Sequence, residues 1–230
     1  MNIFDIIGPV MIGPSSSHTA GAVRLGRVAN KIMNIKSIDA LRGLKLEIIL
    51  SGSFARTYKG HGTDRALLAG VMGYHSYSSE IRDALDIAKS QGIDYKFIEQ
   101  DIKDAHPNTA RINFELGNNS GYIQGASIGG GNIRVDLVNG MRVDFTGENN
   151  TILVMHWDRP GVIADVTSLM RLKYPNANIA NFKLSRKERG GEALMTIELD
   201  NRRDAADERG MAADIQGLNN VINAIVIRAI

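Results

Sequence analysis

Residues 13–21 read GPSSSHTAG, and this turn decides where the first helix of the chain begins. Pro14 is tolerated in a turn, and Ser and Thr side chains accept hydrogen bonds from the free N–H groups of a first helical turn. We therefore expect a helix to begin between Ser15 and Thr19. Apolar side chains recur at helical spacing from residue 20 to 32, so the helix is predicted to run through that segment.

The same turn gathers groups that favour a small anion. Its side chains stand beside free N–H groups and the positive end of a helix dipole, which together attract negative charge. We expect a substrate carboxylate or a phosphate to bind there. The alternative is that one serine caps the helix, the other serines face solvent and the histidine is a surface residue. The candidate anion-binding residues of this turn are Ser15, Ser16, Ser17, His18 and Thr19.

The charge balance of the chain argues against two classes of partner. Lys and Arg number 27, Asp and Glu number 25, and the formal net charge is +2. No long run of like charge occurs, whereas binding to nucleic acid or an acidic membrane requires a basic patch. Residues 1–7 lack the basic start of a secretion signal, and no stretch approaches the length of a membrane span. We expect a cytoplasmic protein that binds neither nucleic acid nor membrane.

Cysteine is absent from the whole sequence. Its absence excludes disulfides, thiolate nucleophiles and any zinc or iron–sulfur centre whose thiolates come from this chain alone. No metal site is therefore expected within the chain.

Hydropathy patterns predict a mixed α/β domain over residues 1–147. Residues 44–50 alternate and then become fully apolar, as a strand that enters a core does. The segment YKGHGTD, residues 58–64, is predicted to be a loop in which Thr63 or Asp64 caps a short helix.

Strands dominate the second half of this domain. Three glycines at 129–131 separate two strands with no helix after them, so they indicate a bend or a bulge rather than a phosphate loop. The dipeptide Asn139-Gly140 is typical of a two-residue hairpin. The elements expected are helices at 65–72 and 79–91 and strands at 94–98, 110–116, 122–128, 132–138 and 141–145.

The polar segment TGENN, residues 146–150, marks a domain boundary beyond which the pattern begins afresh. Strands and helices then follow in the order β-α-β-β-α-β, which is the order of a ferredoxin-like module. The chain is therefore predicted to be α+β, with domains at 1–147 and 148–230. In the second domain we expect strands at 151–156, 179–184, 193–199 and 221–227 and helices at 162–172 and around 203–218.

Two histidines of the first domain lie in predicted loops where an imidazole can meet a ligand. His61 lies between two glycines, which leave room for a ligand to approach the backbone. His106 precedes Pro107, which holds it in an extended conformation. A general base near neutral pH is most often a histidine, although an ordinary loop histidine is more often exposed or hydrogen-bonded within its turn. His75 has no such context and is expected to be structural.

Three motifs in this order resemble the β chain of the iron–sulfur-dependent L-serine dehydratases. They are residues 13–19, GHGTD at 60–64 and HPN at 106–108, followed by DRPG at 158–161 in the small second domain. The resemblance covers essentially the whole chain and implies elimination of water from L-serine, which yields pyruvate and ammonia without pyridoxal phosphate. It also implies a [4Fe-4S] cluster held by cysteines of a separate α chain, in agreement with a chain that has none.

The resemblance implies a role for each site residue. His61 corresponds to the proposed base and His106 to a second histidine that orients it or shares a proton with it, so the two are expected to titrate together. Lys59 and Asp64 could each fix His61 in place. Alternatively, the Lys59 side chain is simply solvated and Asp64 caps its helix. The substrate-binding residues are then expected to be Ser15, Ser16, Ser17, His18, Thr19, Lys59, Gly60, Gly62, Thr63, Asp64 and Asn108, the hydroxyls of the first turn holding the carboxylate of serine.

The second domain resembles an ACT domain, an amino-acid-sensing module that often pairs side by side into a joint sheet. The resemblance places an effector at His156, Asp158, Gly161 and Asn178. Asp158 stands where serine-binding relatives often have Asn, which leaves the identity of the ligand open. The alternative is that this domain serves only in self-association.

A second class of function is also compatible with the sequence. The first domain resembles the allosteric substrate-binding domain of some phosphoglycerate dehydrogenases, so the chain could be a non-catalytic sensor of an amino acid or an anion. The histidine between two glycines favours the enzyme, because a sensor has no need of an imidazole there.

Overall fold

The structure is a computed structural model in which residues 10–200 and 205–229 are described. The chain forms two compact units, the first ending at Asn139 and the second beginning at Gly140. This division falls in a hairpin turn, whereas the sequence placed the boundary after residue 147. No helix in the described ranges is both long and apolar enough to cross a membrane.

A mixed sheet is the scaffold of the first unit; the sixth strand of this sheet, residues 141–145, lies beyond the division at Asn139 and belongs to the second unit. The strand order is β2-β1-β3-β4-β5-β6; β1 and β2 are parallel, whereas β1 pairs antiparallel with β3, β3 with β4 and β4 with β5. The first residues of β1 alternate between exposed and buried, as the strand period requires, and its last three residues, 48–50, are all buried. The strands are β1 (Lys45–Leu50), β2 (Asp94–Glu99), β3 (Thr109–Leu116), β4 (Asn119–Gly129), β5 (Asn132–Val138) and β6 (Met141–Phe145).

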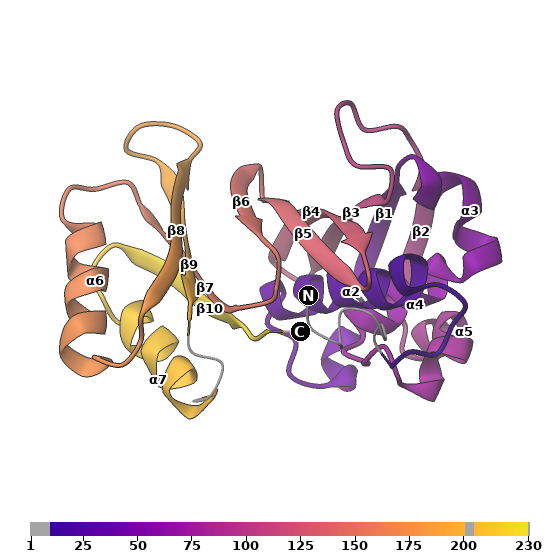
Figure 1. Ribbon diagram of the computed structural model, residues 1–230, viewed down its shortest axis with the longest axis horizontal. Helices are drawn as coiled ribbons and strands as arrows, with labels where there is room; N and C mark the ends of the chain where they lie inside the picture. Colours follow the sequence, from indigo (N-terminus) through magenta and orange to yellow (C-terminus); the bar gives the residue numbers. More distant parts are fainter. Residues whose placement is uncertain (1–9, 201–204, 230) are drawn as a thin grey trace. The chain divides into compact units, whose positions relative to one another are not determined.

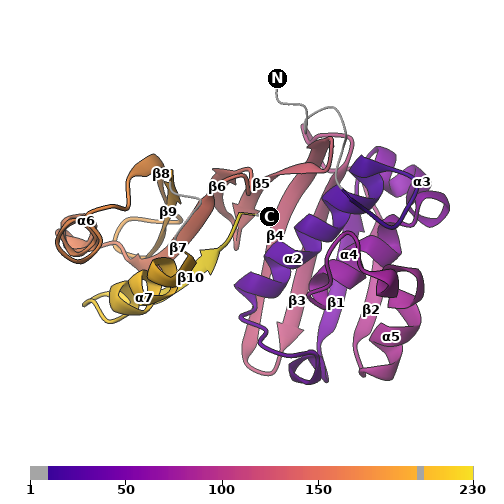
Figure 2. The same ribbon diagram turned by 60° about the horizontal axis from the view of Figure 1, so that its bottom comes forward.

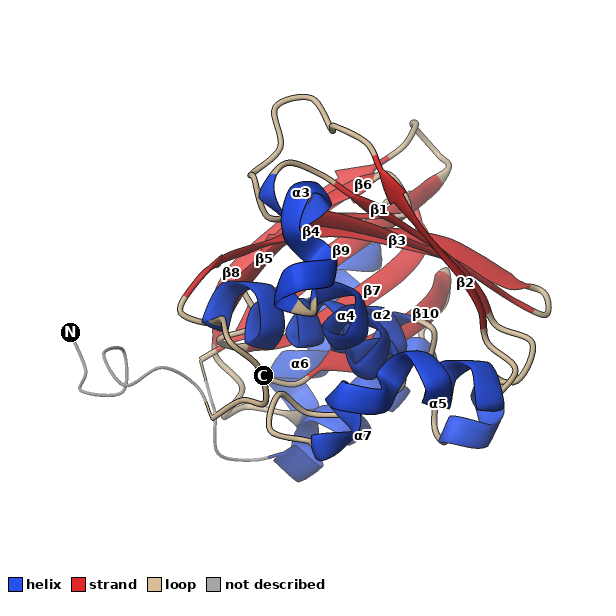
Figure 3. Cartoon of the chain, turned by 90° about the vertical axis from the view of Figure 1, so that its right-hand side faces the viewer, coloured by secondary structure: helices blue, strands red, loops and turns tan. Residues whose placement is uncertain are grey.

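The helices of the first unit cover one face of this sheet (Figures 2 and 3). Helices α2 and α4 pack directly on each other, and a Cβ atom at Gly70 would lie 2.1 Å from the carbonyl oxygen of Val23. This close approach seals the core between the helices and the sheet. The helical elements are η1 (Ser16–Gly21), α2 (Ala22–Ile32), η2 (Ile38–Leu41), α3 (Ser53–His61), α4 (Thr63–Val71), η3 (Ser79–Asp83) and α5 (Ala84–Ser90).

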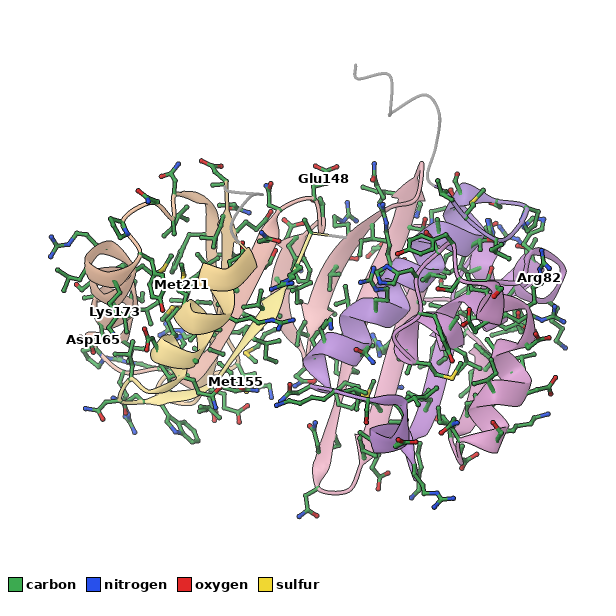
Figure 4. The ribbon with its side chains drawn as sticks, turned by 90° about the horizontal axis from the view of Figure 1, so that it is seen from below. Arg82, Glu148, Met155, Asp165, Lys173 and Met211 are labelled. Atoms are coloured by element: carbon green, nitrogen blue, oxygen red, sulfur yellow. The ribbon has the colours of Figure 1, made fainter. Side chains whose placement is uncertain are left out.

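The second unit has the predicted ferredoxin-like order, so the α+β fold class is confirmed. Its sheet order is β10-β7-β9-β8, and both helices pack on one face of it around a shared apolar core (Figure 1). Met211 of α7, labelled in Figure 4, is a fully buried member of that core. The elements are β7 (Asn150–Trp157), α6 (Val162–Lys173), β8 (Ile179–Arg186), β9 (Glu192–Leu199), α7 (Ala205–Gln216) and β10 (Val221–Ile227).

Two local predictions about turns are confirmed. Asn139 and Gly140 join β5 to β6 with φ angles of 50° and 83°, as a two-residue hairpin turn requires. The three glycines lie where β4 turns into β5, next to a register shift between Ser127 and Gly129. The carbonyl oxygen of Gly131 accepts a hydrogen bond of 2.7 Å from Arg24 on α2, which fixes this bend against the helix.

The prediction of a loop at 58–64 is wrong, because most of that segment is helical. Helix α3 runs to His61, and Gly62, at φ 71°, turns the chain directly into α4. The buried ring of Phe54 anchors α3, so tertiary packing overrides the weak helix propensity of the glycine-containing segment. Neither Thr63 nor Asp64 caps α4, since the N-cap position belongs to Gly62 and no side chain bonds there.

Candidate functional site

The fold brings the three sequence motifs of the first unit together. The Ser53 N–H at the start of α3 donates to the carbonyl oxygen of Pro107 at 2.6 Å, and the Ser127 N–H on β4 donates to that of Asn108 at 3.1 Å. The Ser53 hydroxyl lies 3.4 Å from Nε2 of His18. The serine turn, helix α3 and the His-Pro-Asn loop therefore form one site.

The serine turn combines a cap with a wide helical turn. The Ser15 hydroxyl accepts the N–H of His18 at 3.2 Å, so one serine is the N-cap, as one alternative held. Residues 16–21 form a π-helical turn that continues into α2, a conformation often found at functional sites. Thr19 is buried, and its hydroxyl has no hydrogen-bond partner in the part of the chain that the structure describes. A buried orphan hydroxyl is a natural place for a ligand atom.

His18 is not a surface residue, contrary to one alternative. Only 9% of it is exposed, and its ring lies between the hydroxyls of Ser15 and Ser53, each 3.4 Å from a ring nitrogen. Burial and the nearby imidazole of His61 lower the pKa of His18. The ring is therefore neutral near pH 7, because both causes disfavour the imidazolium.

His61 is the last residue of α3 and is exposed to solvent. Its ring lies 4.7 Å from that of His18, centroid to centroid, with the two planes nearly perpendicular at 85°. His61 therefore contacts His18 with its ring and also lines a pocket.

This pocket has a volume of about 440 Å³ and is lined by the end of α3, the entry to the serine turn and η3. It lies in the size range of pockets that hold small molecules. Of the predicted substrate-binding residues, Thr19, Lys59, Gly60 and Gly62 line it. Its further lining residues are Met11, Ile12, Gly13, Pro14, His61, Arg65, Ile81 and Arg82.

Three cations surround the pocket: Lys59, Arg65 and Arg82, the last labelled in Figure 4. Within residues 10–200 and 205–229, no carboxylate lies within 4.0 Å of any of them. The buried carboxyl of Asp64 lies nearby, and burial raises its pKa despite the opposing effects of Arg65 and Lys59. The pocket is therefore positive. Sequence reasoning missed both arginines, because Arg82 comes from a distant segment and Arg65 lies within an ordinary amphipathic helix.

The His-Pro-Asn loop presents His106 in a defined tautomer. The Asn108 N–H donates to Nδ1 of His106 at 3.1 Å, so in the neutral ring the proton is on Nε2. The Asn108 side chain approaches the carbonyl oxygen of Ser127 at 3.5 Å. No ring contact joins His106 to His61 in the described part of the chain; the histidine against His61 is His18. The predicted titration coupling between His61 and His106 thus stays a prediction.

The donors needed for a metal cluster are not gathered in this chain. It has no cysteine, and among the described residues no group of three His, Asp or Glu side chains is placed to hold an ion. A [4Fe-4S] cluster therefore does not fit the residues of this chain by themselves.

The predicted effector residues lie at two ends of the second sheet. The Asp158 carboxylate accepts the Gly190 N–H at 3.0 Å and pairs with Arg186 at 2.9 Å; these bonds lower the pKa of Asp158. His156 is buried beside it, and one of its ring nitrogens has no partner among the described residues. Gly161 closes the same loop as the N-cap of α6, at φ 93°.

Asn178 lies at the opposite end of that sheet, where its side chain bonds to the Asp200 carboxylate. His156 pairs with Ala193, whereas the strand that Asn178 precedes begins opposite Leu199. The strand advances roughly 20 Å between residues 193 and 199, at about 3.3 Å per residue. One copy of the chain therefore does not place Asn178 beside the other three residues.

Comparison with known proteins identifies the family that this fold and site represent. The family model described as "Serine dehydratase beta chain" matches residues 2–137. The chain belongs to this family.

Two relatives are similar over most of their length. A probable L-serine dehydratase, beta chain, of Bacillus subtilis (strain 168) is 42% identical over 203 residues, which are 88% of this chain and 89% of the relative. The L-serine dehydratase, beta chain, of Peptoniphilus asaccharolyticus is 38% identical over 86% of both chains. A D-3-phosphoglycerate dehydrogenase of Methanocaldococcus jannaschii is 30% identical over 68% of this chain but only 29% of its own length. That match agrees with a likeness to phosphoglycerate dehydrogenases.

Proposed function

We propose that this chain is the β subunit of an L-serine ammonia-lyase, which eliminates water from L-serine and yields pyruvate and ammonia. The observation that carries the proposal is His61, an exposed imidazole on a positive pocket in a chain of the serine dehydratase beta family. Two of the relatives described above are named beta chains, and such a name implies an α partner for those proteins. The same assembly is proposed here.

The reaction requires a base for the Cα proton of serine and a positive site for its carboxylate. His61 takes the proton, because histidine is the commonest general base in enzymes and this ring lines the pocket. Thr19, Lys59 and Arg65 hold the carboxylate through the Thr19 hydroxyl and two cations that form no ion pair among the described residues. His106, whose Nδ1 accepts the Asn108 N–H, is proposed to offer its Nε2–H to the substrate. Further contacts to serine are proposed from Ser16, Ser17, Gly60, Gly62, Thr63, Asp64 and Asn108.

The departing hydroxyl requires a Lewis acid, and the described residues of this chain gather no group that could hold a metal ion. A [4Fe-4S] cluster on the partner chain would supply a Lewis acid for that oxygen. His61 is exposed in this chain. A base that works away from water has to be covered, and docking of the partner chain would cover it. The chain alone is therefore expected to be inactive.

The test of this function is to co-express the chain anaerobically with a cysteine-bearing partner and assay pyruvate formed from L-serine. Activity is expected in the two-chain assembly and not in either chain alone. Deamination of serine by the purified chain alone would contradict the division of the site between two chains.

Arg65→Gln is expected to raise KM for L-serine about tenfold while kcat changes less than threefold. A tenfold change in affinity corresponds to about 1.4 kcal/mol, which is close to the value of one charge-assisted hydrogen bond. Steady-state kinetics of the assembly measure both constants. Arg42→Gln is the control, since Arg42 is exposed at the end of η2 and does not line the pocket. A fall in kcat with an unchanged KM would assign Arg65 a different role.

The second unit is proposed to be an ACT domain that binds an amino-acid effector between two copies. Strand β8 is an edge strand, and Phe182 and Leu184 on it are 36% and 39% exposed. Antiparallel pairing of two β8 strands brings the start of one beside the end of the other. Asn178 of one copy then meets the loop of Asp158 and Gly161 in the other, next to His156, which one copy alone does not achieve.

Asn178→Ala is expected to abolish the heat of L-serine binding to the full chain without its partner, because the amide would be a direct ligand contact. Isothermal titration measures it. Asn118→Ala is the matched control and should retain the heat, since Asn118 is exposed in the turn between β3 and β4 and lies in neither proposed binding site. No heat from the wild-type chain at millimolar serine would favour an ACT domain that serves in assembly alone.

A non-catalytic sensor is the second candidate, favoured by the match to a D-3-phosphoglycerate dehydrogenase. A sensor would bind its ligand in the first unit. Replacement of His61 would then leave any pyruvate formation by the two-chain assembly unchanged. The kinetic experiments on His61 separate the two candidates.

A further inference from the structure

Residues on one side of helix α3 contact the ring of His18. The contacts come from Ser53 and Phe54 in the first turn of the helix and from His61 at its end. Residues seven or eight positions apart lie on the same side of a helix, because two turns span about seven residues. The ring centroids of His18 and Phe54 are 5.2 Å apart, and those of His18 and His61 are 4.7 Å apart. His18 thus connects the two ends of α3.

Both ring nitrogens of His18 already face hydroxyls of the protein. Nδ1 lies 3.4 Å from the Ser15 hydroxyl, and Nε2 lies 3.4 Å from the Ser53 hydroxyl. Neither His18 nor Ser53 lines the pocket that His61 faces. A role in direct contact with the substrate therefore does not suit His18, although its sequence position suggests one.

His61 has few other contacts that could orient it. It is exposed, it ends its helix, and no hydrogen bond of its ring is formed within the described part of the chain. A general base must point its lone pair at the proton that it removes, and a displacement of about 1 Å can cost ~100-fold in rate. The ring of His18 is the surface that limits the rotation of His61.

We propose that His18 is a positioning residue for His61 and that the Ser53 hydroxyl fixes His18 in the orientation that holds the base. This inference rests on the proposed role of His61 and adds Ser53 to the working parts of the site. Neutral His18 suits the role, because an imidazolium at this distance would repel the protonated base that forms during the reaction.

Ser53→Ala tests the proposal in the two-chain assembly. We expect kcat to fall about tenfold with KM within twofold of wild type, because orientation of the base matters in the transition state and substrate binding does not use Ser53. Ser53→Thr, which keeps the hydroxyl, should restore most of kcat. Ser90→Ala is the matched control, since that hydroxyl bonds only within α5.

The double variant shows whether Ser53 acts through His18. If it does, adding Ser53→Ala to His18→Ala lowers kcat no further, because the group that Ser53 orients is already gone. Ser53 is only half-buried, so the single variant is expected to fold even if His18→Ala does not.

Four outcomes would overturn the proposal. They are a wild-type kcat in Ser53→Ala, a rise in KM at constant kcat in Ser53→Ala or His18→Ala, additive losses in the double variant, and equal losses in Ser53→Ala and Ser53→Thr. Each is distinguishable from failure of the proposed function, which would leave the His61→Ala assembly active. With His61 essential and Ser53→Ala at wild-type kcat, only the positioning role would be lost.

Discussion

His61→Ala is expected to lower kcat of the two-chain assembly by about 10³-fold, within the range that a general base contributes. The physical reason is that the Cα proton of serine is only weakly acidic, and no other imidazole faces the pocket in the described residues. KM should change little, because the carboxylate is held by Thr19, Lys59 and Arg65. Pyruvate formation at saturating serine measures the loss.

The control for this variant is His75→Ala. His75 lies outside the pocket, and its ring stacks on the exposed ring of Tyr77 at 5.1 Å. Its removal should leave kcat within twofold of wild type. A His61→Ala assembly that keeps activity within a few-fold of wild type would reject His61 as the base and favour the sensor.

Gly52→Ala has the second-largest expected effect, since two penalties coincide at this residue. Gly52 has φ 61° and ψ −122°, and a Cβ atom there would lie 2.6 Å from the carbonyl oxygen of Pro107. We expect the variant to lose about 3 kcal/mol of stability, from backbone strain and the collision together. For a chain of this size that loss lowers the unfolding midpoint by about 6–12 °C.

Gly117→Ala is the control for a positive φ without a collision. Gly117 has a φ of 59°, and a Cβ atom there meets nothing within 4 Å. The loss in Gly52→Ala should be larger, because ψ at Gly52 is −122° and the new Cβ atom also meets Pro107. Thermal unfolding of both variants measures the two losses, and equal losses would contradict this expectation.

Gly52→Ala should also lower kcat of the assembly, because Pro107 lies between His106 and Asn108. The Ser53 N–H bond to Pro107 holds this loop at the start of α3, and displacement of the loop separates the motifs of the site. An unchanged kcat in a folded variant would show that the loop is not part of the working site.

Much of the fold could be predicted because its signals are local. Alternating strands, the hairpin at Asn139-Gly140 and the β-α-β-β-α-β order each depend on residues near one another in the sequence. The helical character of residues 53–61 could not be predicted in this way. It depends on Phe54 entering the core and on Gly62 reversing the chain, so tertiary packing decided it.

The site shows the same division between local and distant signals. The serine turn and His61 stand out as short motifs, whereas Arg82 reaches the pocket from a separate segment. The spacing of residues in the sequence also did not predict which ring contacts His61. That ring belongs to His18, which the sequence analysis assigned to substrate binding. Ser53 carries no motif at all, and only its distance from His18 marks it.

Chemical rescue of the His61→Ala assembly tests the central claim, that this chain supplies the base, most directly. The pocket has a volume of about 440 Å³, which can admit a free imidazole where the side chain was removed. We expect added imidazole to restore pyruvate formation in a saturable manner, with rates that rise with the basicity of substituted imidazoles, as general-base catalysis requires. An inactive variant that imidazoles of any basicity leave inactive, or one that is active without them, would contradict the claim.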